Sequence, residues 1–216
     1  MLKNANNIQA TPKIGEGIFL TTDVSQILGL PYPKVRRWMK EYWPNYTFGD
    51  ADNQAVNFKT LIEFYTFFHL RDKGLSVKQI EKYHQTIARE LNTSYPFARS
   101  IRTDGKSVWY ELLGNLIKAD RKQQFDIKPI LEPFLHKIDF GNSEVAQRFF
   151  PLKNTKAIVV DPQRQFGQPI VNGTSIKAET LYILYKGGEK TEHIVELYDL
   201  RVSQVKHAIG YFRNVA

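Results

Sequence analysis

Apolar residues first recur at helical spacing shortly after the N-terminus. A helix is predicted up to Leu28, with the capping side chains of Thr21-Thr22-Asp23 before it and Gly29 after it. A second helix is predicted over Pro33–Tyr42, because proline fits the first turn of a helix and Pro44 stops its continuation. Two short helices joined by a tight turn that contains glycine are typical of a helix-turn-helix.

The second of these helices separates its apolar side chains from its basic ones. One face carries Val35, Trp38, Met39 and Tyr42, and the opposite face carries Arg36, Arg37 and Lys40, with Lys34 at its edge. A helix that is anchored by one face and basic on the other suits the major groove of DNA. A solvated basic face on an ordinary surface helix is the alternative, which the preceding turn disfavours. The side chains expected to contact DNA are Tyr32, Lys34, Arg36, Arg37, Lys40 and Lys59.

The rest of the N-terminal region is predicted to be mostly helical. Residues 44–57 favour a hairpin wing, and a long helix follows over Phe58–Lys73. Gly74 breaks that helix, and Ser76 caps another that runs to about Leu91. The aromatic residues of the long helix are expected in the core or on a dimer surface rather than in a ligand site, and they are Phe64, Tyr65, Phe67 and Phe68.

The middle of the chain mixes alternating segments with one helical pattern. Asp104-Gly105 lies between Arg99–Thr103 and Ser107–Glu111, which is a strong hairpin signal. Helical spacing predicts a helix that includes Ile130–Ile138, and Val145–Phe150 alternates as a strand would. We expect a small α+β element here that connects its neighbours or supports dimerisation.

The C-terminal region begins with a predicted strand, Ala157–Pro162. Three helices are predicted after it, over Ala178–Lys186, Thr191–Tyr198 and Ser203–Arg213. The last helix is expected to bury one apolar face, formed by Val205, Ala208, Ile209 and Phe212. A short turn at Asp199 joins the last two helices, so they again resemble a helix-turn-helix within a trihelical unit.

These patterns predict a mainly helical α+β chain in four parts. The parts are a flexible tail over residues 1–17, a winged helix-turn-helix domain over 18–95, an α+β connecting or dimerisation region over 96–156, and a strand with a trihelical homeodomain-like unit over 157–216. No internal repeat is evident in the sequence.

Composition narrows the class of protein and its partners. Of the 216 residues, 42% are hydrophobic and 24% are charged, which is typical of a soluble globular chain. The sequence has no cysteine and no apolar signal segment near its N-terminus, so a cytoplasmic protein without a membrane span is expected. The formal charge of +8 favours a polyanionic partner. That charge is spread over the chain, with +3 in residues 1–95, +4 in 96–156 and +1 in 157–216.

No pattern of catalytic residues stands out. No two of the histidines have the helical spacing of a zinc site, and the chain contains no glycine-rich phosphate loop and no nucleophile elbow; the histidines are His69, His84, His136, His193 and His207. Gly167 and Gly173 are interpreted as turn glycines. We therefore expect neither an enzyme nor a metal or cofactor site.

The N-terminal region resembles the winged-helix domain of MerR-type regulators over about residues 18–90. The residues that carry the resemblance are Thr22-Asp23-Val24, Leu28-Gly29-Leu30, Val35-Arg36-Arg37-Trp38, Asn57-Phe58 and Leu70-Arg71-Asp72-Lys73-Gly74-Leu75-Ser76-Val77-Lys78-Gln79-Ile80. The resemblance implies that Arg36 contacts the DNA backbone and that the wing contributes. Asn57 stands where that family usually has arginine, and the wing carries Asp50 and Asp52.

The C-terminal region is similar to a small domain of unknown function that occurs in VapB-type antitoxins. Its marks are Asp161-Pro162, Gly167-Gln168-Pro169-Ile170-Val171, Gly173-Thr174-Ser175-Ile176, Tyr185-Lys186-Gly187-Gly188-Glu189 and Val205-Lys206-His207-Ala208-Ile209. Ser175 replaces a usual arginine, and Arg201 replaces the usual threonine that caps the last helix, so that cap is expected to be weakened or moved to Ser203. The resemblance implies a toxin partner, commonly a PIN-like ribonuclease.

Three functional hypotheses follow. The first is a homodimeric DNA-binding antitoxin that neutralises a PIN-like toxin and regulates its own operon through a roughly palindromic operator. The second is a toxin-binding module without DNA binding, and the third is a MerR-like regulator that senses a small ligand. The near-neutral C-terminal region favours a protein contact there over a DNA contact.

Overall fold

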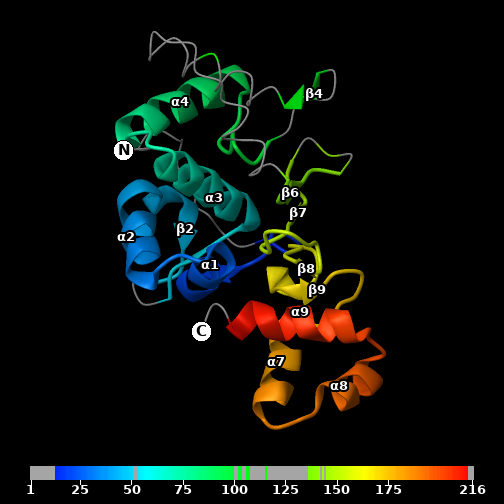
Figure 1. Ribbon diagram of the computed structural model, residues 1–216. Helices are drawn as coiled ribbons and strands as arrows, with labels where there is room; N and C mark the ends of the chain where they lie inside the picture. The colour runs from blue at the N-terminus through cyan, green and yellow to red at the C-terminus, as the bar shows by residue number, and fades with distance from the viewer. Residues whose placement is uncertain are drawn as a thin grey trace.

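The computed structural model describes residues 13–50, 53–99, 102–103, 106–107, 115, 136–141, 143 and 145–213. These residues form an α+β fold of seven α-helices and four small antiparallel sheets (Figure 1). None of the helices among them is long and apolar enough to cross a membrane.

The N-terminal unit combines two short helices with a three-stranded sheet. Its elements are β1 (Phe19–Leu20), α1 (Thr21–Leu28), α2 (Tyr32–Tyr42), the 3-10 helix η1 (Pro44–Tyr46), β2 (Thr47–Phe48) and β3 (Ala55–Val56). The sheet order is β1-β3-β2, and both neighbours run antiparallel to β3, with Val56 opposite Phe19 on one side and Thr47 on the other. The predicted pair of helices and the predicted hairpin are therefore present.

Helix α1 begins earlier than the sequence predicts. Thr21 to Asp23 were expected to cap it from outside, but they form its first turn, and Leu20 occupies the N-cap position. The Asp23 carboxylate accepts a hydrogen bond from the Leu20 N–H at 2.8 Å. An acidic residue in the first turn satisfies a free N–H and also complements the helix dipole, so the helix can start without a polar cap residue.

Two longer helices support this unit. Helix α3 (Phe58–Asp72) is capped by Asn57 and α4 (Val77–Glu90) by Ser76, as the sequence predicts for Ser76. The phenylalanines of α3 lie in the core, and Tyr65 is partly buried against it. Phe68 stacks on Trp38 of α2 at 4.2 Å between ring centroids, and Phe67 meets the same ring edge-on at 4.9 Å. The aromatic cluster of α3 thus holds α2 in place.

A carboxylate is buried at the centre of the same core. Glu63 of α3 is fully buried, and its Oε2 lies 2.9 Å from Nε2 of His84 on α4. Its other oxygen accepts hydrogen bonds from the backbone N–H groups of Phe97 and Ala98 at 2.8 and 3.0 Å. One side chain therefore joins two helices to the segment that leaves the N-terminal unit.

The middle region contains two small strand pairs. β4 (Arg102–Thr103) pairs with β5 (Lys106–Ser107), which confirms the predicted hairpin, and β6 (Ile138–Asp139) pairs with β7 (Arg148–Phe149). The predicted helix over Ile130–Ile138 lies outside the described residues except for its end, and there it is wrong, because Ile138 is in β6. Ile138 is buried opposite Phe149, and a β-branched residue with a partner strand packs well in a sheet whatever its local spacing suggests.

The C-terminal unit matches its predicted elements closely. It contains β8 (Ile158–Val159), the 3-10 helix η2 (Gln165–Gly167), β9 (Ile170–Val171), α7 (Ala178–Lys186), α8 (Thr191–Tyr198) and α9 (Val202–Arg213). The predicted apolar face of α9 is buried against α7, α8 and β8. Arg201 remains at the start of α9, where Gln204 Oε1 accepts a hydrogen bond from its N–H at 3.0 Å, so the cap is not moved to Ser203.

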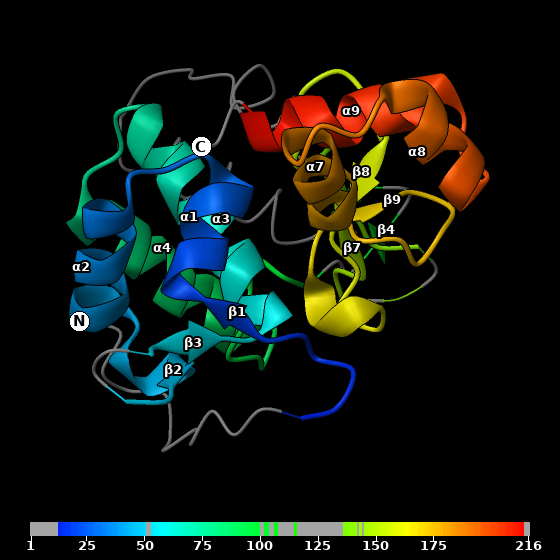
Figure 2. The same cartoon turned by 90° about the horizontal axis from the view of Figure 1, so that it is seen from below.

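The loop around η2 fixes the C-terminal unit to the N-terminal one. Ile18 N–H donates to the carbonyl of Phe166 at 2.9 Å, and Gly167 lies against the ring of Phe19. Burial raises the pKa of Asp23 above its usual range, although hydrogen bonds from Leu20 and Gln168 act in the other direction. Figure 2 shows the C-terminal unit on the side of α1 and β1, with α2 on the outer side of the N-terminal unit.

Candidate nucleic-acid interface

The turn between α1 and α2 sets the direction of α2. Gly29 adopts a left-handed conformation, with φ of 65° and ψ of 40°, which costs a glycine little. Its N–H donates to the Gln26 carbonyl and the Leu30 N–H donates to the Ser25 carbonyl, so the end of α1 is satisfied by backbone groups. Pro31 then takes the N-cap position of α2.

The predicted separation of faces on α2 is present in the structure. Val35, Trp38 and Met39 are buried. The basic side chains of Lys34, Arg36, Arg37 and Lys40 are exposed, and Tyr32 is 38% exposed at the start of the helix. Five of the six residues predicted to contact DNA therefore share one helix, and we call the surface formed by Tyr32, Lys34, Arg36, Arg37 and Lys40 the α2 face.

The α2 face borders a shallow hollow of about 400 Å³. Its lining comes from α2 and from Gln54, which precedes β3 in the wing. Gln54 could not be assigned to this surface from the sequence, because its proximity to α2 depends on how the hairpin folds back. An amide side chain at this position can bond either a phosphate or a base edge.

Local contacts orient two of the cations. The Lys34 ammonium lies 5.2 Å from the ring centroid of Trp38 and 5.3 Å from that of Phe68, which are cation–π distances. Arg37 Nε lies 3.9 Å from a carboxylate oxygen of Glu41 one turn on. Both members of that pair are about half exposed or more, so it is weak and leaves the guanidinium able to exchange partners.

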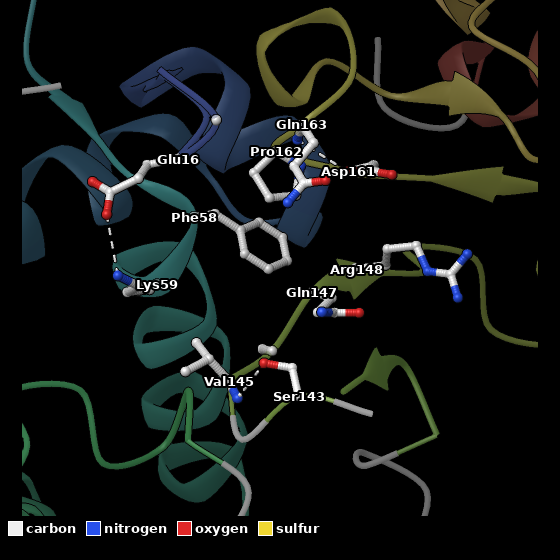
Figure 3. A pocket seen from close by; sticks show the side chains of 12 residues that line it. Glu16, Phe58, Lys59, Ser143, Val145, Gln147, Arg148, Asp161, Pro162 and Gln163 are labelled. Atoms are coloured by element: carbon white, nitrogen blue, oxygen red, sulfur yellow. Dashed lines mark hydrogen bonds and ion pairs between the residues drawn. The ribbon is translucent and has the colours of Figure 1, made fainter. Parts of the chain in front are cut away.

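Lys59 is not brought to the α2 face. It lies at the start of α3, where its ammonium is 3.1 Å from a carboxylate oxygen of Glu16 (Figure 3). Both side chains line a different hollow of about 360 Å³, between α3 and the β7 and β8 segments. Glu16 belongs to the predicted flexible tail, yet it contacts α3 twice, because its carbonyl also accepts a hydrogen bond from Phe58 N–H at 2.8 Å.

One of the acidic residues of the wing, Asp50, has a structural role. Asp50 Oδ1 accepts hydrogen bonds from Asn53 N–H at 2.8 Å and from Asn53 Nδ2 at 3.3 Å. Gly49 has φ of 90°, and a Cβ there would lie 2.3 Å from the Asn53 carbonyl oxygen. Asp50 therefore shapes the tip of the hairpin, while Asp52 lies outside the described residues.

Asn57 is explained by its position as the N-cap of α3. Its Oδ1 accepts hydrogen bonds from the Thr60 N–H and the Thr60 hydroxyl, both at 2.9 Å. An arginine at this position would lack the short acceptor that the helix start uses. The position at which the resemblance to MerR-type regulators leads one to expect arginine is therefore used to cap α3 in this chain.

Replacing Asn57 with alanine is expected to lower the free energy of unfolding by about 1 kcal/mol, because a buried N–H loses its cap. Asn57→Asp keeps an acceptor at the same reach and should retain most of the stability. Urea unfolding followed by tryptophan fluorescence measures both variants. Equal losses for the two variants would contradict the capping role.

Comparison with known proteins adds three similarities. Residues 158–212 match the model of a family described as "Protein of unknown function (DUF433)". The chain is 20% identical over 172 residues to "Putative antitoxin VapB45" of Mycobacterium tuberculosis, covering 74% of this chain and 72% of that protein. It is 21% identical to "Uncharacterized protein Rv2308" of the same organism, covering 96% of this chain and 95% of that one.

A solved structure has the same fold. The crystal structure of Rv2018 from Mycobacterium tuberculosis matches with a TM-score of 0.71 at 18% identity, over 88% of this chain and 96% of that one. The chain therefore shares its fold over most of its length with a solved protein, and over 74% of its length it is similar to a protein named as an antitoxin. Its C-terminal quarter matches the model of a family of unknown function.

Proposed function

We propose that this chain is the antitoxin of a toxin–antitoxin pair and that it binds operator DNA through the α2 face. The observation that carries the proposal is an exposed basic helix, backed by an aromatic core and flanked by a hairpin, in a chain similar to an antitoxin-like protein. A toxin–antitoxin role is supported by that similarity, and the DNA contact is supported by the geometry of α2.

The α2 face would bind DNA mainly by neutralising phosphates. Arg36 and Lys40 are exposed one turn apart, which suits two neighbouring phosphates along one groove edge. We assign base-edge contacts to Arg37 or Lys34, because arginine and lysine can both bond the edge of a guanine. The exposed Tyr32 ring and Gln54 extend the same contact at its rim.

A single copy of this face offers few charged contacts, so we propose a homodimer on a roughly palindromic operator. In such dimers the two recognition helices enter major grooves about 34 Å apart. The toxin partner is proposed to be a PIN-like ribonuclease that this chain blocks by binding, with no reaction, metal or cofactor of its own, in the cytoplasm.

The triple variant Arg36→Ala, Arg37→Ala, Lys40→Ala is expected to bind duplex DNA more weakly at every sequence. The slope of log K against log salt should fall by about one unit for each phosphate that is no longer neutralised, so by about two to three units in total. Fluorescence anisotropy with a labelled duplex of about 40 bp over a salt series measures the slope. The same assay on the DNA upstream of the gene tests specific binding.

A matched variant separates the effect of the α2 face from that of net charge. Lys78→Ala, Arg89→Ala, Lys153→Ala removes three exposed positive charges away from α2 and should leave the slope nearly unchanged. An unchanged affinity and slope in the α2 variant would refute DNA binding by this face.

The toxin-binding module without DNA binding is the second candidate, because the C-terminal region is nearly neutral, the wing is acidic, and Glu41 pairs with Arg37 of the α2 face. Co-purification of the neighbouring gene product, combined with no anisotropy change on any duplex, would select it. The ligand-sensing alternative predicts a thermal shift in a small-molecule screen.

A further inference from the structure

The C-terminal unit repeats the geometry of α1 and α2. Helices α1 and α8 each have eight residues, and a three-residue turn follows each of them before α2 or α9 begins. Thr21 corresponds to Thr191 and Tyr32 to Val202, so the two helix pairs keep one constant offset of 170 residues. The sequence shows no such repeat because few of the corresponding residues are identical.

The two turns have the same backbone conformation and the same hydrogen bonds. Asp199 is left-handed, with φ of 49° and ψ of 50°, as Gly29 is. Its N–H donates to the Glu196 carbonyl and the Leu200 N–H donates to the Val195 carbonyl, which reproduces the two bonds at the end of α1. A left-handed backbone conformation costs a glycine little but costs other residues more. The turn at Asp199 therefore keeps the conformation of the Gly29 turn although its residue does not favour it.

The second helices of the two pairs also bury and expose corresponding positions. On α9 the residues at the positions of Val35, Trp38 and Met39 are Val205, Ala208 and Ile209, and all three are buried. The positions of Arg36 and Arg37 are taken by Lys206 and His207, which are both exposed. The first position is apolar and exposed in each helix, with Tyr32 at 38% and Val202 at 44%.

The C-terminal region has a small net charge but contains one basic and one acidic segment. From Leu200 to Arg213 the chain has three basic residues and no acidic one. The acids gather instead on and beside α8, where Glu189, Glu192, Glu196 and Asp199 are all exposed. The value of +1 for residues 157–216 is thus an average over a basic segment at α9 and an acidic segment at α8.

We propose that α9 is a second DNA-contacting helix, with Arg201, Ser203, Lys206 and His207 as its surface. The partner is duplex DNA, because the face is basic, free of carboxylates, and presented by the same helix–turn–helix geometry as the α2 face. Lys206 and Arg201 bind phosphates, Ser203 donates to a phosphate or base edge, and Val202 contacts the groove wall. The proposal rests on the proposed function for its DNA partner, but it adds a separate site.

The two helices lie in different parts of the molecule, with α2 on the outer side of the N-terminal unit and α9 on the far side of α1 (Figure 2). The α9 face therefore engages a segment of duplex other than the one α2 occupies. The exposed acids on and beside α8 disfavour contact with the duplex, because like charge repels the phosphate backbone.

Position-specific crosslinking tests the proposal directly, because the chain has no cysteine of its own. Ser203→Cys, Tyr32→Cys and Glu192→Cys are made one at a time in the full chain and labelled with an azidophenacyl photocrosslinker. Each is mixed with a random-sequence duplex of about 40 bp at low salt, where phosphate contacts are strongest, and irradiated. We expect crosslinks from Ser203→Cys and Tyr32→Cys, and none from Glu192→Cys on α8.

A salt series gives an independent measurement. Arg201→Ala, Lys206→Ala should reduce the slope of log K against log salt by about two units. Lys153→Ala, Lys190→Ala removes the same charge from exposed positions outside α2 and α9 and should reduce it by less than about half a unit. Both variants change exposed side chains only, and circular dichroism confirms that they fold.

The outcomes are distinguishable. A crosslink from Tyr32→Cys without one from Ser203→Cys overturns the α9 site and leaves the proposed function standing. If neither Tyr32→Cys nor Ser203→Cys gives a crosslink, both the α9 site and DNA binding by the α2 face are overturned. A crosslink from Ser203→Cys alone supports the α9 site and contradicts DNA binding by the α2 face. Equal slope changes in the two charge variants would show an effect of net charge only and overturn the α9 site.

Discussion

Replacing Glu63 with alanine is expected to lower the free energy of unfolding by about 3–5 kcal/mol. The carboxylate accepts hydrogen bonds from the Phe97 and Ala98 N–H groups and contacts His84. All of these groups are buried, so none of them gains water when the acceptor is removed. Urea unfolding measured by tryptophan fluorescence and by circular dichroism gives the change.

Two further variants define the cause. Glu63→Gln keeps one carbonyl oxygen for the backbone N–H groups and should cost clearly less than alanine. Glu90→Ala removes an exposed carboxylate from α4 and should change stability by less than about 0.5 kcal/mol. A loss below about 1 kcal/mol for Glu63→Ala would mean that the site collapses or admits water, and the proposed role of the carboxylate would be wrong.

Replacing Gly167 with alanine is expected to destabilise the chain by about 2–4 kcal/mol, from backbone strain and overpacking together. Gly167 has φ of 89°, and a Cβ there would lie 2.3 Å from Cζ of Phe19. Phe19 is fully buried between the two units, so its ring cannot move away without opening that contact. Urea unfolding and limited proteolysis measure the loss.

Gly173→Ala is the matched control, because Gly173 has φ of 86° and open space where the Cβ would lie. It carries the backbone strain without the clash and should cost about 1–2 kcal/mol. The difference between the two variants measures the close approach of the η2 loop to Phe19. Equal losses in the free energy of unfolding for the two variants would show that the η2 loop moves to relieve the clash with Phe19. Gly167 would then be needed only for its backbone conformation in the turn.

Helices that are set off by strong end signals could be predicted from the sequence. The bounds of α7 and α8 match their prediction, because Gly187-Gly188 and Asp199 end them and their apolar spacing is regular. The helix predicted to reach Ile138 fails at that end, since its spacing is compatible with a helix but Phe149 supplies a strand partner. Local pattern cannot reveal a strand partner that lies beyond the next turn of the chain.

The parts of the site that the sequence predicts are those on one helix. The α2 face follows from helical spacing alone, so the amino-acid sequence is enough to assign Arg36, Arg37 and Lys40 to one surface. Lys59 could not be placed in this way, because its pairing with Glu16 spans 43 residues. Glu63 and His84 look like ordinary polar residues on their own helices, and their burial becomes visible only when the helices pack.

The position of Phe19 determines which fragments of this chain can fold on their own. Its strand lies in the N-terminal unit, but Gly167 covers its ring and the Phe166 carbonyl accepts the N–H of its neighbour Ile18. A fragment that ends at residue 156 would expose the ring of Phe19 and leave the Ile18 N–H without its acceptor. The boundary visible in the sequence is therefore a poor site for expressing the two halves separately, and a fragment that folds well needs the η2 loop or a polar replacement for Phe19.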